Sequence, residues 1–114
     1  MRLIILGAGG YGCTVADVAL QTGKKSRIVH PTAYVSPTAH IADGCVILPH
    51  AIVNTGCEVK KGCIVNCGAI VDHGCILEEG VHVCLGAIVK AENRIPRCLK
   101  IEAGEVIANR TYPV

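Results

Sequence analysis

Every sixth residue from position 29 to position 107 is Val, Ile or Leu, without exception. The fourteen residues are Val29, Val35, Ile41, Ile47, Val53, Val59, Val65, Val71, Leu77, Val83, Val89, Ile95, Ile101 and Ile107. A period of six matches neither the 3.6-residue period of a helix nor the two-residue alternation of a long strand. It is typical of a short strand and a turn repeated many times, and it therefore predicts a parallel β-helix built from hexapeptides.

The other half of each hexapeptide has the composition of a tight corner. Four residues after each aliphatic comes a small or apolar residue: Ala33, Ala39, Cys45, Ala51, Cys57, Cys63, Ala69, Cys75, Val81 and Ala87. The residue before it is Gly in seven of these ten repeats. Glycine tolerates a positive φ at a turn without steric cost. In known hexapeptide folds three units make one triangular coil, so fourteen units predict four to five coils, with residues 18 apart stacked.

Residues 1–26 differ in kind from the repeat. An apolar stretch at 3–6 is followed by a GxGxxG sequence at 7–12, and 13–21 reads as a helix. This order predicts a short βα unit whose glycines bring backbone N–H groups close to a phosphate. The second strand and acidic residue of a dinucleotide site do not follow. A structural cap and a working nucleotide site both remain open. The predicted organisation is a truncated Rossmann-like unit (1–26), a β-helix (27–107) and a C-terminal tail (108–114).

Composition narrows the class of protein. The 114 residues carry a net charge of +2 and only three aromatic side chains, all Tyr, which argues against a nucleic-acid partner. The apolar runs are too short for a membrane span or a signal peptide. No pair among the eight cysteines has CxxC spacing, and four occupy small inward slots, so buried structural thiols are expected. Reduced thiols fit a soluble cytoplasmic protein.

The histidines are the candidates for chemistry: His30, His40, His50, His73 and His82. The first three lie in irregular early units and are expected to be solvated. His73 is expected at a corner and His82 on the next side, both pointing outward, and a neutral imidazole is a suitable general base. Zinc, as in hexapeptide-fold carbonic anhydrases, is disfavoured. No two histidines are closer than nine residues and none are 36 apart, so no metal site is expected.

Four segments together resemble a known family. They are LGAGGYG at 6–12 with ADVA at 16–19, VHPTAYVSP at 29–37, IVNCGAIVDH at 64–73 and VHVCLGA at 81–87. Nearly the whole chain is similar to the hexapeptide-repeat sialic-acid and UDP-amino-sugar acetyltransferases. The resemblance implies a left-handed β-helix, a homotrimer, acetyl-CoA as cosubstrate between neighbouring subunits, and a sugar or sugar nucleotide as acceptor.

The resemblance also implies roles for individual residues. His73 would be the general base, His82 would contact acetyl-CoA, Asn66 would line the acceptor pocket, and Gly9, Gly10 and Tyr11 would lie at the sugar-nucleotide site. Stacking places Ala91 one coil above His73, where its backbone N–H would steady the thioester oxyanion.

The chain departs from the family pattern at three places. Gly74 stands where an acidic residue usually orients the base, so Gly74→Asp is expected to raise turnover. Asp72 compensates only if its side chain turns toward the imidazole, whereas adjacent residues usually point apart. Tyr11 replaces a histidine, and most of the nucleotide domain is missing between Lys25 and Arg27.

Two functions follow from these features. The first is an acetyl-CoA-dependent acetyltransferase acting on an amine or hydroxyl of a sugar. The second is a non-catalytic trimeric scaffold or inactive paralogue. Trimerisation itself is expected from an outer apolar stripe of Ile52, Ile70 and Ile88, which recur every 18 residues directly before inward positions.

Overall fold

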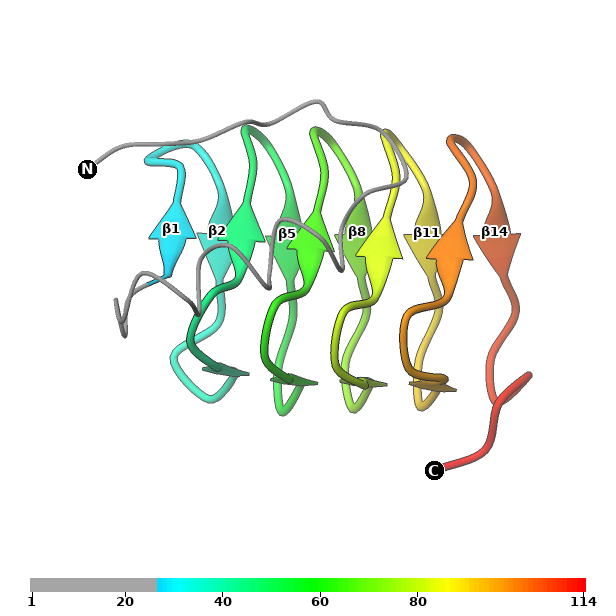
Figure 1. Ribbon diagram of the computed structural model, residues 1–114. Coiled ribbons are helices and arrows are strands. Elements are labelled where there is room, and N and C mark those ends of the chain that lie inside the picture. Colours follow the sequence, from blue (N-terminus) through cyan, green and yellow to red (C-terminus); the bar gives the residue numbers. More distant parts are fainter. Residues whose placement is uncertain (1–26) are drawn as a thin grey trace.

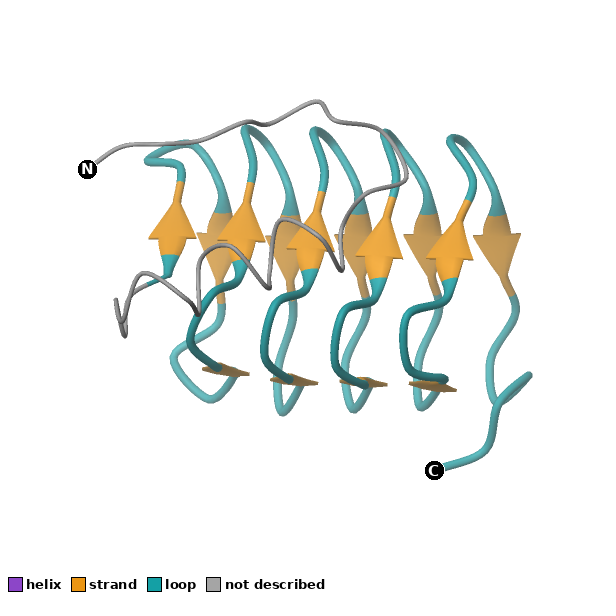
Figure 2. Cartoon of the chain, viewed as in Figure 1, coloured by secondary structure: helices purple, strands orange, loops and turns teal. Residues whose placement is uncertain are grey.

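The structure is a computed structural model that describes residues 27–114, wound as a regular coil (Figure 1). Fourteen strands of two residues each follow one another along this part of the chain, which contains no helix (Figure 2). The parallel β-helix predicted from the six-residue period is thereby confirmed. The βα unit expected over 1–26 lies outside the described residues. Within 27–114, no helix has the length and apolar character needed to cross a membrane.

The strands form three parallel sheets, one on each side of a triangular prism. Sheet A contains β1 (Ile28–Val29), β4 (Val46–Ile47), β7 (Ile64–Val65), β10 (His82–Val83) and β13 (Lys100–Ile101). Sheet B contains β2 (Tyr34–Val35), β5 (Ile52–Val53), β8 (Ile70–Val71), β11 (Ile88–Val89) and β14 (Val106–Ile107). Sheet C contains β3 (His40–Ile41), β6 (Glu58–Val59), β9 (Ile76–Leu77) and β12 (Arg94–Ile95). Partners in adjacent strands are 18 residues apart, as for Ile64 and His82, so each coil takes three hexapeptides.

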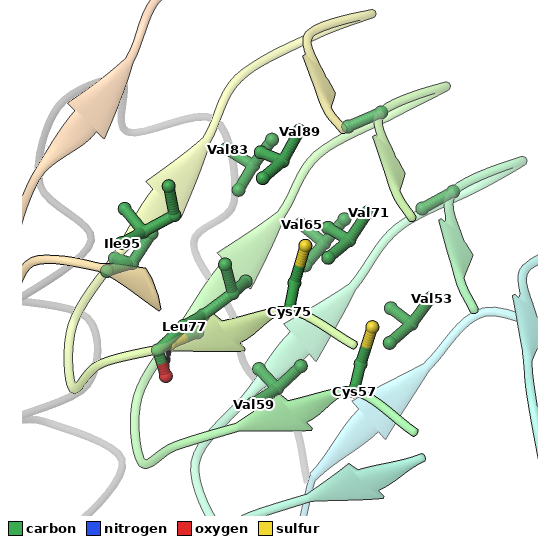
Figure 3. Close-up of a cluster of buried hydrophobic side chains, with 14 of the residues drawn as sticks. Val53, Cys57, Val59, Val65, Val71, Cys75, Leu77, Val83, Val89 and Ile95 are labelled. Atoms are coloured by element: carbon green, nitrogen blue, oxygen red, sulfur yellow. Dashed lines mark hydrogen bonds between the residues drawn. The ribbon is translucent and has the colours of Figure 1, made fainter. Parts of the chain in front are cut away.

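The second residue of each strand points into the prism. On sheet B, Val53, Val71 and Val89 stack in one column and are completely buried (Figure 3). Such columns make up the aliphatic core, and each buried side chain contributes roughly 1.5–3 kcal/mol. The first coil is the exception, since Val29 remains 39% exposed.

Cysteines fill the inward slots at two corners. Cys45, Cys57, Cys63 and Cys75 are all buried. The thiol of Cys57 donates to the carbonyl oxygen of Asp72 at 2.9 Å, and that of Cys75 to Lys90 at 3.1 Å, so each bonds a carbonyl fifteen residues later. A hydrogen bond with Cys45 and then burial raise the pKa of Cys63, which keeps this thiol protonated. The prediction of buried structural thiols is therefore confirmed for these four residues.

The C-terminal segment folds back across the last coil. Asn93 occupies an inward slot and is completely buried, and its Nδ2 donates to the carbonyl oxygens of Lys90 (2.9 Å) and Ala108 (2.8 Å). Its Oδ1 accepts the N–H of Tyr112 at 2.8 Å, and the Tyr112 side chain packs against the core. A polar side chain is tolerated at this end because every one of these hydrogen bonds is made.

Candidate functional site

His73 lies at the corner between sheets B and C, two residues after the end of β8, as expected from its place in the repeat. Its side chain is 57% exposed. Thr55 and Ala91 occupy the equivalent corner positions one coil below and one coil above. The corners are joined by backbone hydrogen bonds: the N–H of Gly74 donates to Thr55 O at 2.9 Å and that of Glu92 to His73 O at 3.1 Å. The coil thus holds the backbone of His73 in place while its ring faces solvent.

Asp72 turns toward the His73 ring. Its Oδ1 accepts the backbone N–H of His73 at 2.7 Å and lies 3.1 Å from Nδ1 of the imidazole. The two side chains do not alternate as they would in a strand, because the chain is already turning at these residues. The backbone N–H of His73, followed by its imidazole, holds the pKa of the Asp72 carboxyl below its usual range. A carboxylate at Nδ1 favours the proton on that nitrogen and leaves Nε2 as the free base.

Gly74 has no room for an acidic side chain without adjustment. Its φ is +70°, and an added Cβ would lie 3.3 Å from Cγ of Glu92, one coil above. The Glu92 side chain is itself held by Arg110, whose Nε lies 2.7 Å from Oε1. An aspartate at position 74 would therefore strain the corner, and the expectation that it would assist His73 stays a prediction. The carboxylate that orients the ring comes from Asp72 instead.

Ala91 stands one coil above His73, as the stacking argument predicted. Its backbone N–H donates to Oδ1 of Asn109 at 3.0 Å. The amide expected to bind the thioester oxygen is thus held by an amide carbonyl of the C-terminal segment. Asn109 stacks one further coil above, and nothing in the six-residue period indicates which way its side chain turns.

Asn66 and His82 lie together, away from His73. His82 is on the outer side of β10 in sheet A, as predicted, but it is only 4% exposed. Nδ2 of Asn66 lies 3.1 Å from Nε2 of His82, and Oδ1 of Asn66 accepts the N–H of Cys67 at 2.8 Å. The bond from Cys67 fixes which end of the amide is the oxygen, so the NH₂ group faces His82. An amide NH₂ group can only donate, and Nε2 of His82 is therefore the acceptor. Asn66 is at the corner between sheets A and B and His73 at the corner between sheets B and C, so the pair and His73 occupy different places within one chain.

The three early histidines and the residues of the glycine-rich segment remain to be placed. His40 and His50 are exposed, and His30 is half-buried with its Nδ1 2.9 Å from Oγ1 of Thr32. Among residues 27–114, no three His, Cys, Asp or Glu side chains are grouped to hold a metal ion. Gly9, Gly10 and Tyr11 lie outside the described residues.

No protein-family model and no curated protein matches the sequence of this chain. Among solved structures it is similar to the acetyltransferase domain of PglB from Neisseria gonorrhoeae FA1090, with 36% identity and a TM-score of 0.79. That match covers 87% of this chain and 50% of the other, so the chain spans half the length of this relative.

Two further structures align with this chain at lower identity and lower TM-score. A mutant of GDP-perosamine N-acetyltransferase from Caulobacter crescentus, solved with CoA and GDP-perosamine, is 18% identical, with a TM-score of 0.49 over 85% of this chain and 55% of the other. The same PglB domain solved with acetyl coenzyme A aligns at 19% identity, with a TM-score of 0.30 over 87% and 64%. These homologue structures hold CoA or acetyl-CoA. The PglB match, at 36% identity over 87% of this chain, confirms the resemblance to the hexapeptide-repeat acetyltransferases that the sequence indicated.

Proposed function

We propose that this protein transfers an acetyl group from acetyl-CoA to an amine or hydroxyl of a sugar or sugar nucleotide, with His73 as the general base. The observation that carries the proposal is the exposed Asp72–His73 pair, with the backbone amide of Ala91 one coil above it. The class of reaction is supported by the likeness to the PglB acetyltransferase domain.

In this mechanism the acceptor attacks the thioester carbonyl directly. Nε2 of His73 takes the proton from the attacking amine or hydroxyl, while Asp72 holds the ring and stabilises the imidazolium that forms. The carbonyl oxygen becomes negative in the tetrahedral intermediate, and the N–H of Ala91 binds it once Asn109 is displaced. The carbon–sulfur bond then breaks, and the imidazolium returns its proton to the CoA thiolate.

The working form in this proposal is a cytoplasmic homotrimer of left-handed coils. The outer positions of sheet B form an apolar stripe, made of Tyr34, Ile52, Ile70, Ile88 and Val106. Its two ends, Tyr34 and Val106, are more than half exposed, so the stripe offers an association surface. His73 follows Ile70 by three residues and would reach the subunit boundary. There Asn66 of a neighbouring copy, with its amide bonded to the buried His82, would complete a site for acetyl-CoA and the acceptor.

Residues 1–26 complete the proposal as the sugar-nucleotide part of the site, with Gly9, Gly10 and Tyr11 at the ligand. Sedimentation tests the assembly. We expect the mass of three chains, and we expect Ile70→Lys to give monomers because a charge then interrupts the stripe. A wild-type mass of one chain at all concentrations would overturn the trimer.

A non-catalytic trimeric scaffold is the second candidate. The observation that favours it is the bond between the Ala91 N–H and Asn109, which closes the expected oxyanion position. Calorimetry with acetyl-CoA separates the two, since the scaffold predicts no binding. Loss of thioester absorbance with UDP- or GDP-linked amino sugars then tests turnover. Binding with turnover supports the transferase, and binding of neither acetyl-CoA nor acceptor refutes it.

A further inference from the structure

Asn54 is connected to the His73 ring through Asp72. The two residues occupy equivalent corner positions in successive coils, 18 residues apart. Nδ2 of Asn54 donates to Oδ1 of Asp72 at 3.3 Å. This is the same oxygen that accepts the N–H of His73 and approaches its Nδ1. The coil below the base therefore reaches the carboxylate that touches the base.

The direction of the Asn54 amide is determined by Thr55. Oδ1 of Asn54 accepts the backbone N–H of Thr55 at 2.8 Å and its hydroxyl at 3.2 Å. Turning the amide over would set its NH₂ against these two donors and its oxygen against the carboxylate. The Nδ2 group is therefore the one that faces Asp72, and Asn54 presents a donor to that carboxylate.

Without this donor, the hydrogen bonds described for the Asp72 carboxylate all come from His73 itself. The Asp72 side chain is 37% exposed, and the terminal torsion of an aspartate is broad. Rotation about that torsion would take Oδ1 away from Nδ1 of His73. We propose that Asn54 is a positioning residue for the general base, acting through Asp72 to keep the proton on Nδ1 and Nε2 free. The inference rests on the proposed function for its catalytic consequence, but its effect on the ring can be measured without turnover.

Two variants remove the amide donor that faces Asp72. Asn54→Asp retains an acceptor at Oδ1 but sets a second carboxylate against Asp72. Asn54→Ser uses the residue found at this position one coil below, where Oγ of Ser36 accepts the N–H of Thr38, two residues further along the chain, at 3.3 Å. Both changes are at a half-exposed corner, and thermal melting of the trimer checks that the fold survives. If one variant fails to fold, the other still tests the inference.

The first measurement is the tautomer of the His73 ring, read from imidazole ¹⁵N shifts in the full-length protein at a pH where the ring is neutral. The wild type is expected to hold its proton mainly on Nδ1, and both variants are expected to shift protons toward Nε2. Unchanged tautomer populations in a folded variant would overturn the inference. This measurement tests the role of Asn54 even if the wild type shows no acetyl transfer. Failure of the proposed function can therefore be told apart from failure of this inference.

The second measurement uses turnover with an accepted UDP- or GDP-linked amino sugar. Asn54→Ser is expected to lower kcat by roughly two- to tenfold with KM unchanged, the effect of one hydrogen bond. In an Asp72→Asn background the same change should lower kcat no further, because Asn54 acts through Asp72. An equal loss in both backgrounds would show a purely structural role and would overturn the inference.

Discussion

The interior and the corners of the prism repeat in different ways. Inside, the second residue of each strand is aliphatic in every coil, as with Val53, Val71 and Val89 (Figure 3). At the corner after sheet B, the equivalent residues are Thr55, His73 and Ala91. These aliphatic columns are uniform because each coil must fit the next at native packing density. A corner side chain only has to avoid its neighbours, so chemistry can vary there without loss of the fold.

The largest effect is expected inside. Val65→Asp should unfold the protein, because an unpaired carboxylate would take the place of a completely buried aliphatic. Thermal melting or circular dichroism measures it. Leu85→Asp is the matched control, since this corner leucine is 54% exposed and the change should alter stability by less than about 0.5 kcal/mol. Equal melting temperatures for the two variants would contradict the difference between interior and corner.

The next largest effect is expected at His73. His73→Ala should lower acetyl transfer by about 10²–10⁴-fold while leaving the trimer and its melting temperature unchanged, because a positioned general base accounts for that range. Steady-state kinetics and sedimentation measure the two properties. His40→Ala, another exposed histidine, should keep full turnover. Unchanged turnover in His73→Ala would remove this residue from the mechanism.

Two corner glycines test whether a side chain in the coil above adds to the stability cost of a substitution. Gly56 and Gly74 have φ of +69° and +70°, but only the second would bring an added Cβ within 4 Å of another group, Cγ of Glu92. Alanine at either position should cost about 1–2 kcal/mol through the left-handed backbone. Gly74→Ala should cost more, because Glu92 has to move. Denaturant unfolding compares them, and a smaller loss for Gly74→Ala would contradict this account.

The smallest effect is expected at Asn109. Asn109→Ala frees the N–H of Ala91 and should tighten acetyl-CoA binding roughly two- to tenfold, the equivalent of one hydrogen bond. Calorimetry measures the dissociation constant. If stability falls while binding stays the same, Asn109 is a structural cap and Ala91 has no part in the site. The scaffold hypothesis expects no binding before or after the change.

The sequence by itself determined the coil. One aliphatic every six residues specifies the inward columns, the corners between them and the 18-residue register seen between Ile64 and His82. This was possible because each hexapeptide repeats the same local rule, and neighbouring coils then follow from packing. It also placed His73 at an outward corner and Ala91 one coil above it.

Only the tertiary structure decided where the corner side chains turn. The sequence expectation was that Asp72 would point away from His73, yet its carboxylate lies against the ring. The bonds from Asn54 to Asp72 and from Ala91 to Asn109, and the burial of His82, likewise have no signal in the repeat. A corner residue has neither the alternation of a strand nor a core to fill, so its direction is set by the hydrogen-bond partners that the coils above and below bring within reach.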